Sequence, residues 1–176
     1  MSNLKLRRAD MIRLTDMTAR RFDAMLMRGH APWPQREAGR SWGEFSTEDA
    51  YRVALAHAFI RLGRSYEDAG RAVRAEFNDL VELEASQPGD LMYGGFITQT
   101  EPGEDSVTLI LPLIAPHTSL FDELARVKQL VAADDVVLAL TVVNATEIMK
   151  RLYERAVALG LVDERLTELA QRVRAL

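Results

Sequence analysis

Hydrophobic residues recur at helical spacing through the first half of the chain, most clearly over residues 47–62. There the apolar positions follow the i, i+3, i+4, i+7 pattern of a helix that buries one face. They are Tyr51, Ala54, Leu55, Ala58, Phe59 and Leu62. His57 falls off this stripe, so we expect it to face solvent. A hydroxyl at Ser46 or Thr47 would cap the helix at its start, and Gly63 would end it.

Two shorter helices are predicted before this one. Residues 10–14 favour a short helix, and residues 15–17 a turn. Thr18 is a suitable N-cap for a second helix over residues 19–28, because its hydroxyl can accept a hydrogen bond from a free backbone N–H. Gly29 is well placed to end that helix in a left-handed conformation. The predicted buried side of the second helix holds Phe22, Met25 and Leu26.

Another helix start follows at residues 65–68, which are Ser-Tyr-Glu-Asp. A hydroxyl followed by acids is typical of a capped helix N-terminus, so the pattern predicts a helix over about residues 66–77. Its buried side would hold Tyr66, Ala69, Val73 and Phe77. Residues 78–90 are acidic and end in Gln-Pro-Gly-Asp, which is a turn signal. We therefore place a domain boundary there and expect no long helix across it.

The residues beyond this boundary have the composition of β-strands. Segments 91–100 and 106–115 predict two strands, joined as a hairpin by the loop at residues 101–105. Pro112 indicates that the second strand lies at a sheet edge or is leaving the sheet, because proline has no N–H to donate.

The last third of the chain predicts helices around one ambiguous apolar run. Residues 119–131 favour a helix. The run Val136–Val143 fits either a buried strand or the start of a longer helix, and periodicity does not decide at this length. Its β-branched residues and the capping ability of Asn144 favour the strand. Gly160 would end the helix that follows, and a final amphipathic helix would bury Leu166, Leu169, Ala170 and Val173.

The charge of the chain is divided unevenly along its length. The formal net charge is −4. Residues 1–74 contain 14 Lys and Arg against 9 Asp and Glu, a net of +5, whereas residues 75–176 contain 8 against 17, a net of −9. A basic first segment followed by an acidic one suggests that the first part meets a polyanion.

Several classes of function are disfavoured by composition. The chain has no cysteine, which excludes disulfides, thiolate catalysis and cysteine-ligated metal sites. Its three histidines, His30, His57 and His117, do not have metal-ligand spacing, and no catalytic pair of carboxylates is evident. We therefore expect no enzyme and no cofactor. The longest apolar run is far shorter than the roughly 20 residues that span a bilayer, and the N-terminus lacks an apolar signal region. We expect a cytoplasmic protein.

A long basic loop separates the second helix from the helix at 47–62. Residues 30–43 contain prolines and glycines at positions typical of a loop, together with Arg36, Arg40, Trp33 and Trp42. Loops of this length are usually functional or partly ordered, for example as a two-stranded ribbon. We expect Trp33 to serve in packing.

The order of these parts resembles the N-terminal domain of the MerR family of transcription regulators. The matching stretches are MIRLTDM-TARRFDAMLMRG, GRSWGEFSTEDAYRV and ALAHAFIRLG-RSYEDAGRAV, and they fall within about residues 8–77. The resemblance implies a winged helix-turn-helix, with the segment ending at Phe45 as the wing. The family's long coiled-coil dimerisation helix is not expected here, since residues 78–90 are too short and too broken for it.

The resemblance also implies a set of DNA-contacting residues. The second helix would enter the major groove, where arginine reads guanine and also contacts phosphates. The wing would lie over the adjacent backbone or minor groove. Trp42 and Phe45 lie in the wing segment, and we expect them to pin the wing to the core rather than to stack on bases. The candidate DNA-binding residues are Thr18, Arg20, Arg21, Arg28, Arg36, Arg40 and Trp42.

The sequence thus predicts an α+β protein with two domains. Residues 1–85 would form a MerR-like winged helix-turn-helix domain, and residues 91–176 a small α/β domain for dimerisation or sensing. The predicted function is that of a sequence-specific DNA-binding transcription regulator. Its partners would be double-stranded DNA and a second copy of the chain, with RNA polymerase or a small-molecule effector as further candidates. The alternatives are a protein-interaction module, such as an antirepressor-type regulator, and an excisionase-like architectural DNA binder.

Overall fold

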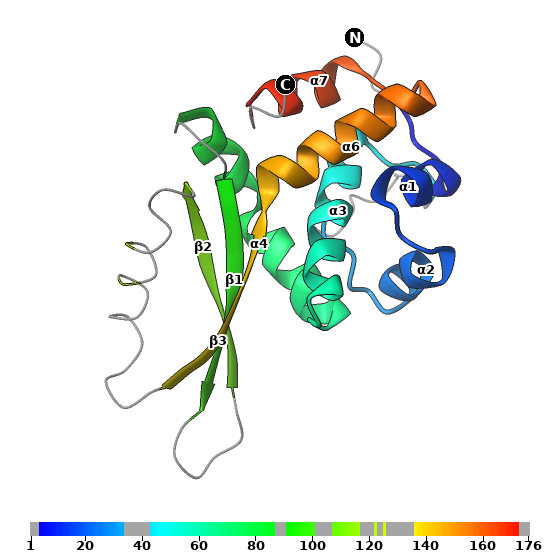
Figure 1. The fold of residues 1–176 in the computed structure, drawn as a ribbon. Coiled ribbons are helices and arrows are strands. Elements are labelled where there is room, and N and C mark those ends of the chain that lie inside the picture. Colours follow the sequence, from blue (N-terminus) through cyan, green and yellow to red (C-terminus); the bar gives the residue numbers. More distant parts are fainter. Residues whose placement is uncertain are drawn as a thin grey trace.

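The computed structural model describes residues 4–33, 43–86, 91–100, 107–116, 122, 125 and 136–172. Helices predominate, and three strands form one antiparallel sheet beside them (Figure 1). The elements are α1 (Arg8–Thr15), α2 (Ala19–Met27), α3 (Thr47–Arg61), α4 (Tyr66–Ser86), β1 (Leu91–Thr100), β2 (Val107–Pro116), β3 (Val136–Asn144), α6 (Ala145–Leu159) and α7 (Glu164–Arg172). Among the described residues, no helix combines the length and the apolar content that crossing a membrane requires.

Helix α3 is the centre of the molecule. It contacts α1, α4, α6, α7 and β3, and ten of its 15 residues are buried. The predicted cap is confirmed, since the Ser46 side chain accepts a hydrogen bond from the N–H of Asp49, whose carboxylate accepts one from the N–H of Ser46. The helix ends at Leu62, and Gly63 follows with a positive φ of 90°.

Two expectations about α3 are wrong. His57 was expected to face solvent, yet only 6% of it is exposed. A helix covered on several sides has no free face, so a residue off the apolar stripe is buried as well. Leu62 was expected to be buried at the end of the stripe, yet 57% of it is exposed. It lies just past the last helical residue, beyond the packing of the neighbouring helices.

Helix α4 is longer than the sequence pattern indicates. It continues from Tyr66 to Ser86, through much of the segment that we interpreted as a linker. At its start it packs closely on the chain that follows α2, because Gly70 lies against the carbonyl oxygen of His30. Phe77 is buried and its ring meets the ring of Tyr51 edge to face at 5.6 Å.

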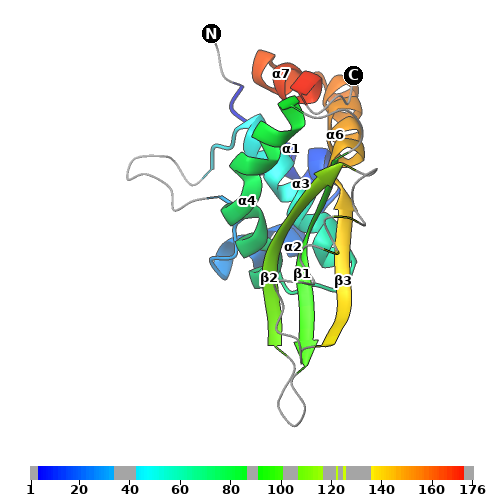
Figure 2. The same cartoon turned by 90° about the vertical axis from the view of Figure 1, so that its left-hand side faces the viewer.

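The sheet has the strand order β2-β1-β3 (Figure 2). The predicted hairpin is confirmed, with β1 and β2 antiparallel and Ile97 opposite Leu109. Pro112 lies on β2, which is an edge strand, as expected. The ambiguous run is a strand, since β3 pairs antiparallel with the other side of β1. Helices α3 and α4 contact the sheet and lie on one side of it. The helix predicted at 119–131 falls almost wholly outside the described residues.

The last two helices join the same hydrophobic core as the first four. Asn144 caps α6 as predicted, by accepting a hydrogen bond from the N–H of Glu147 at 2.8 Å. The Tyr51 hydroxyl donates to the carbonyl of Ala145 at 3.2 Å and so ties α3 to the start of α6. Buried residues on both sides of the predicted boundary form one cluster. The division into residues 1–85 and 91–176 stays a prediction about folding units.

Helix α7 is held to the start of the chain by one carboxylate. Asp163 accepts hydrogen bonds from the N–H of Leu166, from the N–H of Leu4 and from the hydroxyl of Thr47. The first caps α7, and the other two fix α7 against the N-terminal segment and the first turn of α3. The N-terminal segment, the start of α3 and the last helix therefore share one support.

We predict that Gly70→Ala destabilises the protein by about 1–3 kcal/mol, the usual cost of overpacking. A methyl group at this position would overlap the His30 carbonyl, which is backbone and cannot move aside by a rotamer change. Helix propensity alone predicts the opposite sign, a gain of about 1 kcal/mol. Urea denaturation of both proteins distinguishes the two, and an increase in stability would show that α4 does not pack closely on His30.

Candidate nucleic-acid interface

Helices α1 and α2 form a helix-turn-helix with a three-residue connection. Asp16 follows α1 directly and has a left-handed backbone, with φ of 54° and ψ of 28°. Aspartate adopts this conformation more readily than most residues. Thr18 then caps α2 as predicted, its side chain accepting a hydrogen bond from the N–H of Arg21 at 3.3 Å. The chain reverses within this turn, which sets the direction of α2.

Packing against aromatic rings holds the buried side of helix α2 in place. Phe22 and Met25 are fully buried. The ring of Phe22 meets Phe45 edge to face at 5.7 Å, and Phe45 in turn contacts Trp33 at 5.7 Å. The packing role expected for Trp33 and Phe45 is confirmed. Trp33 directly precedes residues 34–42, and Phe45 closely follows them. The two ends of the predicted wing are therefore anchored on the buried side of α2.

A second anchor joins α2 to α1 at the surface. The Arg8 guanidinium donates to both carboxylate oxygens of Asp23, at 2.7 and 2.6 Å. Two parallel hydrogen bonds fix the relative orientation of the groups as well as their distance. The hydrogen bonds from Arg8 hold the pKa of Asp23 below its usual range. Buried packing thus fixes the angle between the two helices, and this exposed ion pair adds a weaker constraint at the surface.

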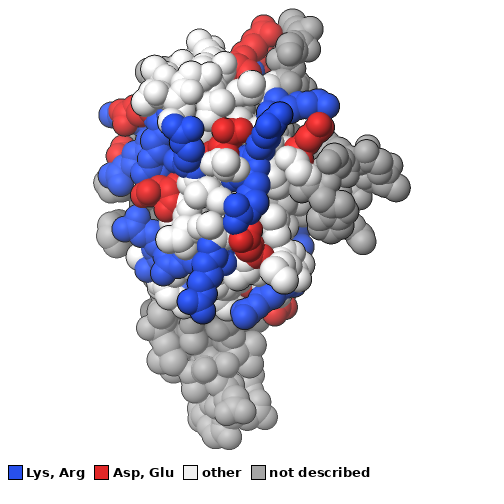
Figure 3. Space-filling model, turned by 90° about the vertical axis from the view of Figure 1, so that its right-hand side faces the viewer, with Lys and Arg blue, Asp and Glu red and all other residues white. Residues whose placement is uncertain are grey.

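The predicted DNA-contacting residues of α2 and its ends are exposed. They are Thr18, Arg20, Arg21 and Arg28. None of these three arginines forms an ion pair with another residue in the described part of the chain. Figure 3 shows the side of the molecule that carries α1 and α2, where Lys and Arg outnumber Asp and Glu. The other three candidates, Arg36, Arg40 and Trp42, lie outside the described residues.

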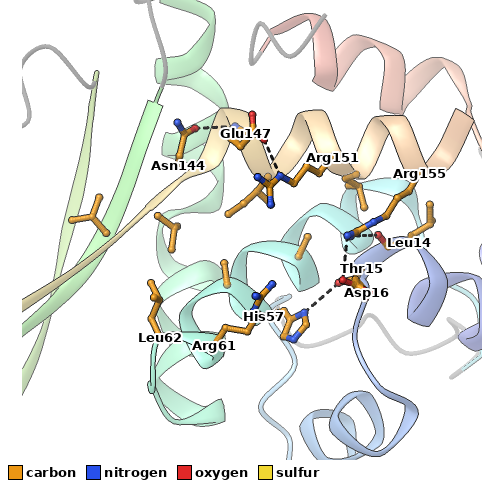
Figure 4. Close-up of a pocket in the computed structure, with 16 residues that line it drawn as sticks. Leu14, Thr15, Asp16, His57, Arg61, Leu62, Asn144, Glu147, Arg151 and Arg155 are labelled. Atoms are coloured by element: carbon orange, nitrogen blue, oxygen red, sulfur yellow. Dashed lines mark hydrogen bonds and ion pairs between the residues drawn. The ribbon is translucent and has the colours of Figure 1, made fainter.

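Two further residues, neither of them predicted as a site residue, contact the turn: His57 of α3 and Arg155 of α6. The His57 ring nitrogen Nδ1 lies 3.2 Å from the carbonyl oxygen of Thr15 (Figure 4). Arg155 of α6 donates to the carbonyl of Leu14 at 3.3 Å and to the carboxylate of Asp16 at 3.2 Å. Carbonyls at a helix C-terminus have no partner inside the helix. These contacts therefore satisfy the end of α1 and brace the turn.

His57 is held neutral by its surroundings. Burial lowers its pKa below the ordinary value of 6.5, and the charges of Arg21 and Arg61 lower it further, against the opposing effects of Thr15 and Asp16. Because a carbonyl only accepts, Nδ1 carries the hydrogen in this arrangement. The other nitrogen, Nε2, is buried and has no hydrogen-bond partner among the described residues.

No feature of the local sequence distinguishes these residues in advance. His57 is one of several polar residues on α3, and Arg155 is one of two arginines on α6. His57 reaches the turn because α3 packs against α1, and Arg155 reaches it because α6 does, which joins parts of the chain 139 positions apart.

Comparison with known proteins adds no family assignment. Neither a scan against protein-family models nor a search of curated proteins finds a match to this chain. The resemblance to the MerR family thus stands on the motifs quoted above.

We predict that the folded state loses stability below about pH 6.5 partly through His57. Its pKa is lowered on folding, so the unfolded chain takes up a proton there before the folded protein does. The free energy of unfolding then falls as the pH falls. Thermal unfolding at pH 7.5 and 5.5 should show a larger loss for the wild type than for His57→Gln, which lacks this titration. Equal losses in both proteins would contradict this account of His57.

Proposed function

We propose that this protein is a sequence-specific DNA-binding transcription regulator that inserts α2 into the major groove. One observation carries the proposal. The helix-turn-helix holds the short helix α2 at a set angle, and α2 presents arginines that have no ion-pair partner among the described residues. A DNA-reading surface keeps its arginines available for phosphates and bases.

The two ends of α2 would have different roles. Thr18, Arg20 and Arg21 lie at its N-terminal end, which is the end that most helix-turn-helix proteins direct at the bases. Arg28 lies at the other end of the helix and would contact the phosphate backbone. A guanidinium can bind the O6 and N7 atoms of guanine with two hydrogen bonds, and each good bidentate pair of this kind is worth about 1–3 kcal/mol of discrimination.

The wing is the second part of the proposed surface. Trp33 and Phe45, which flank residues 34–42 closely, pack beneath α2, and Phe45 pairs with Leu6 through backbone hydrogen bonds of 2.8 and 2.9 Å. Any wing formed between these anchors would start and end beside the proposed reading helix. Arg36, Arg40 and Trp42 are its proposed contacts.

The proposal includes a homodimer. A nine-residue helix with one wing covers little DNA, and readers of this size commonly reach useful affinity by binding two half-sites. A second copy of the chain would supply the second reading helix, and residues 91–176 are the proposed dimerisation region.

A protein-interaction role for the same surface has one observation in its favour. Met27, on the last turn of α2, is 87% exposed, and an exposed apolar side chain can contact a protein partner as well as a thymine methyl group. A substitution that removes the apolar surface, Met27→Ser, should abolish partner binding in the presence of nuclease if the protein-interaction role is correct.

We predict that the purified protein selects a DNA sequence from a random duplex library and that Arg20→Ala weakens its binding. Loss of a phosphate contact should reduce the slope of log affinity against log salt by about 1, whereas loss of a base contact should mainly relax sequence preference. Fluorescence anisotropy over a range of salt concentrations measures both effects.

The matched control for this experiment is Arg172→Ala. Arg172 is exposed as well, but it lies on α7, away from α2 (Figure 1). Its loss should leave DNA binding unchanged. The absence of any DNA binding at low salt would overturn the proposed function, and equal weakening by both substitutions would show that only overall charge matters.

A further inference from the structure

A cleft opens between α3, α6 and the end of β3, beside the helix-turn-helix (Figure 4). Its volume is about 390 Å³, which is within the usual range of about 300–1,000 Å³ for small-molecule sites. The carbonyl end of α1 and the turn residue Asp16 form part of its lining. The cleft is thus continuous with the contacts that brace the turn.

The lining of the cleft combines an apolar floor with positive charge. The apolar part comes from facing positions of α3 and α6, with β3 at one end. It consists of Ala54, Ala58, Val143, Ile148 and Leu152. Three arginines line the same space: Arg61 from α3 on one wall, and Arg151 and Arg155 from α6 on the other (Figure 4).

The arginines are only partly neutralised. Arg151 pairs with Glu147 at 2.8 Å, and Arg155 pairs with Asp16 at 3.2 Å. Both pairs are substantially exposed, so each is weak and can exchange for another anion. Arg61 has no carboxylate partner among the described residues. Three guanidinium groups against two carboxylates leave the cleft with a net positive charge.

We propose that this cleft binds a small organic anion, in which a phosphate or carboxylate group is joined to an apolar body. The anionic group would lie among Arg61, Arg151 and Arg155, which come from opposite walls. The apolar body would cover the floor formed by Ala58 and Ile148. Arginine suits such groups because its planar guanidinium donates two parallel hydrogen bonds to them.

The same site would regulate the proposed reading helix, and this second step rests on the proposed function. An anion in the cleft competes with Asp16 for Arg155, which loosens the turn ahead of α2. It also adds negative charge beside Asp16 and the turn that leads into α2, which opposes the approach of DNA phosphates. Both effects weaken binding to DNA, and by thermodynamic linkage DNA weakens binding of the anion by the same factor.

Phenyl phosphate is a suitable probe, since it combines an anionic group with an apolar ring, and benzyl alcohol is its uncharged counterpart. By titration calorimetry on the full chain, we expect saturable binding of phenyl phosphate, weaker binding of inorganic phosphate and none of benzyl alcohol. Arg61→Gln should reduce the affinity for phenyl phosphate about tenfold or more. The control Arg172→Gln should leave the affinity unchanged, and circular dichroism verifies that both variants are folded.

A second readout is the titration of His57 followed by NMR. Bound phenyl phosphate should raise the pKa of His57, because a nearby negative charge favours the protonated ring. No such rise is expected in Arg61→Gln. Failure of phenyl phosphate to saturate, or equal binding by the wild type and Arg61→Gln, overturns the proposed site.

The DNA arm of the experiment separates the two proposals. A phenyl phosphate concentration that just saturates the wild type should lower the affinity of the wild type for the selected DNA, and the same concentration should have a smaller effect on Arg61→Gln. If the probe binds and no DNA does, the anion site stands and the proposed function fails. If Arg61→Gln itself weakens DNA binding in the absence of the probe, the cleft belongs to the DNA surface, and the small-anion site is overturned.

Discussion

The burial of α3 is the constraint on which the rest of the structure depends. The helix is covered by α1, α4, α6, α7 and β3, so it packs against five of the eight other elements that the structure describes. Two of its polar residues are satisfied within this packing: Asp49 closes the N-terminal cap, and Arg52 pairs with Glu48 at 2.7 Å while its guanidinium lies 4.0 Å from the ring of Phe77. Because α3 holds both α1 and α6, these two helices can meet across the turn of the helix-turn-helix.

The contact between α1 and α6 stabilises the turn that precedes α2, the proposed reading helix. A nine-residue helix has little stability of its own in water, since isolated helices need about 12–15 residues even in favourable sequences. Its direction is therefore determined by its surroundings: the Phe22 and Met25 side chains on the inside, Arg8 on the outside, and the turn behind it. The conformation of that turn depends on hydrogen bonds from Arg155, a residue near the other end of the chain.

The charge division along the sequence is not a division in space. Residues 75–176 are acidic overall, yet α6 contributes Arg151 and Arg155 to the cleft beside α2. The basic character of the first segment is thus extended by the second. This arrangement gives α6 a role in both proposals, since it braces the proposed DNA reader and forms one wall of the proposed anion site.

Local signals in the sequence are enough to predict most helix starts and ends, the hairpin and the exposed arginines of α2. These follow from signals within a few residues, such as the Thr18 hydroxyl, the positive φ available to Gly29 and Gly160, and the spacing of apolar positions. Tertiary structure alone decided the burial of His57, the exposure of Leu62, the continuation of α4 to Ser86 and the site between α3 and α6. Each of these depends on which distant element covers a given surface. A periodic pattern shows that a helix has an apolar side; it does not show how many neighbours the helix will have.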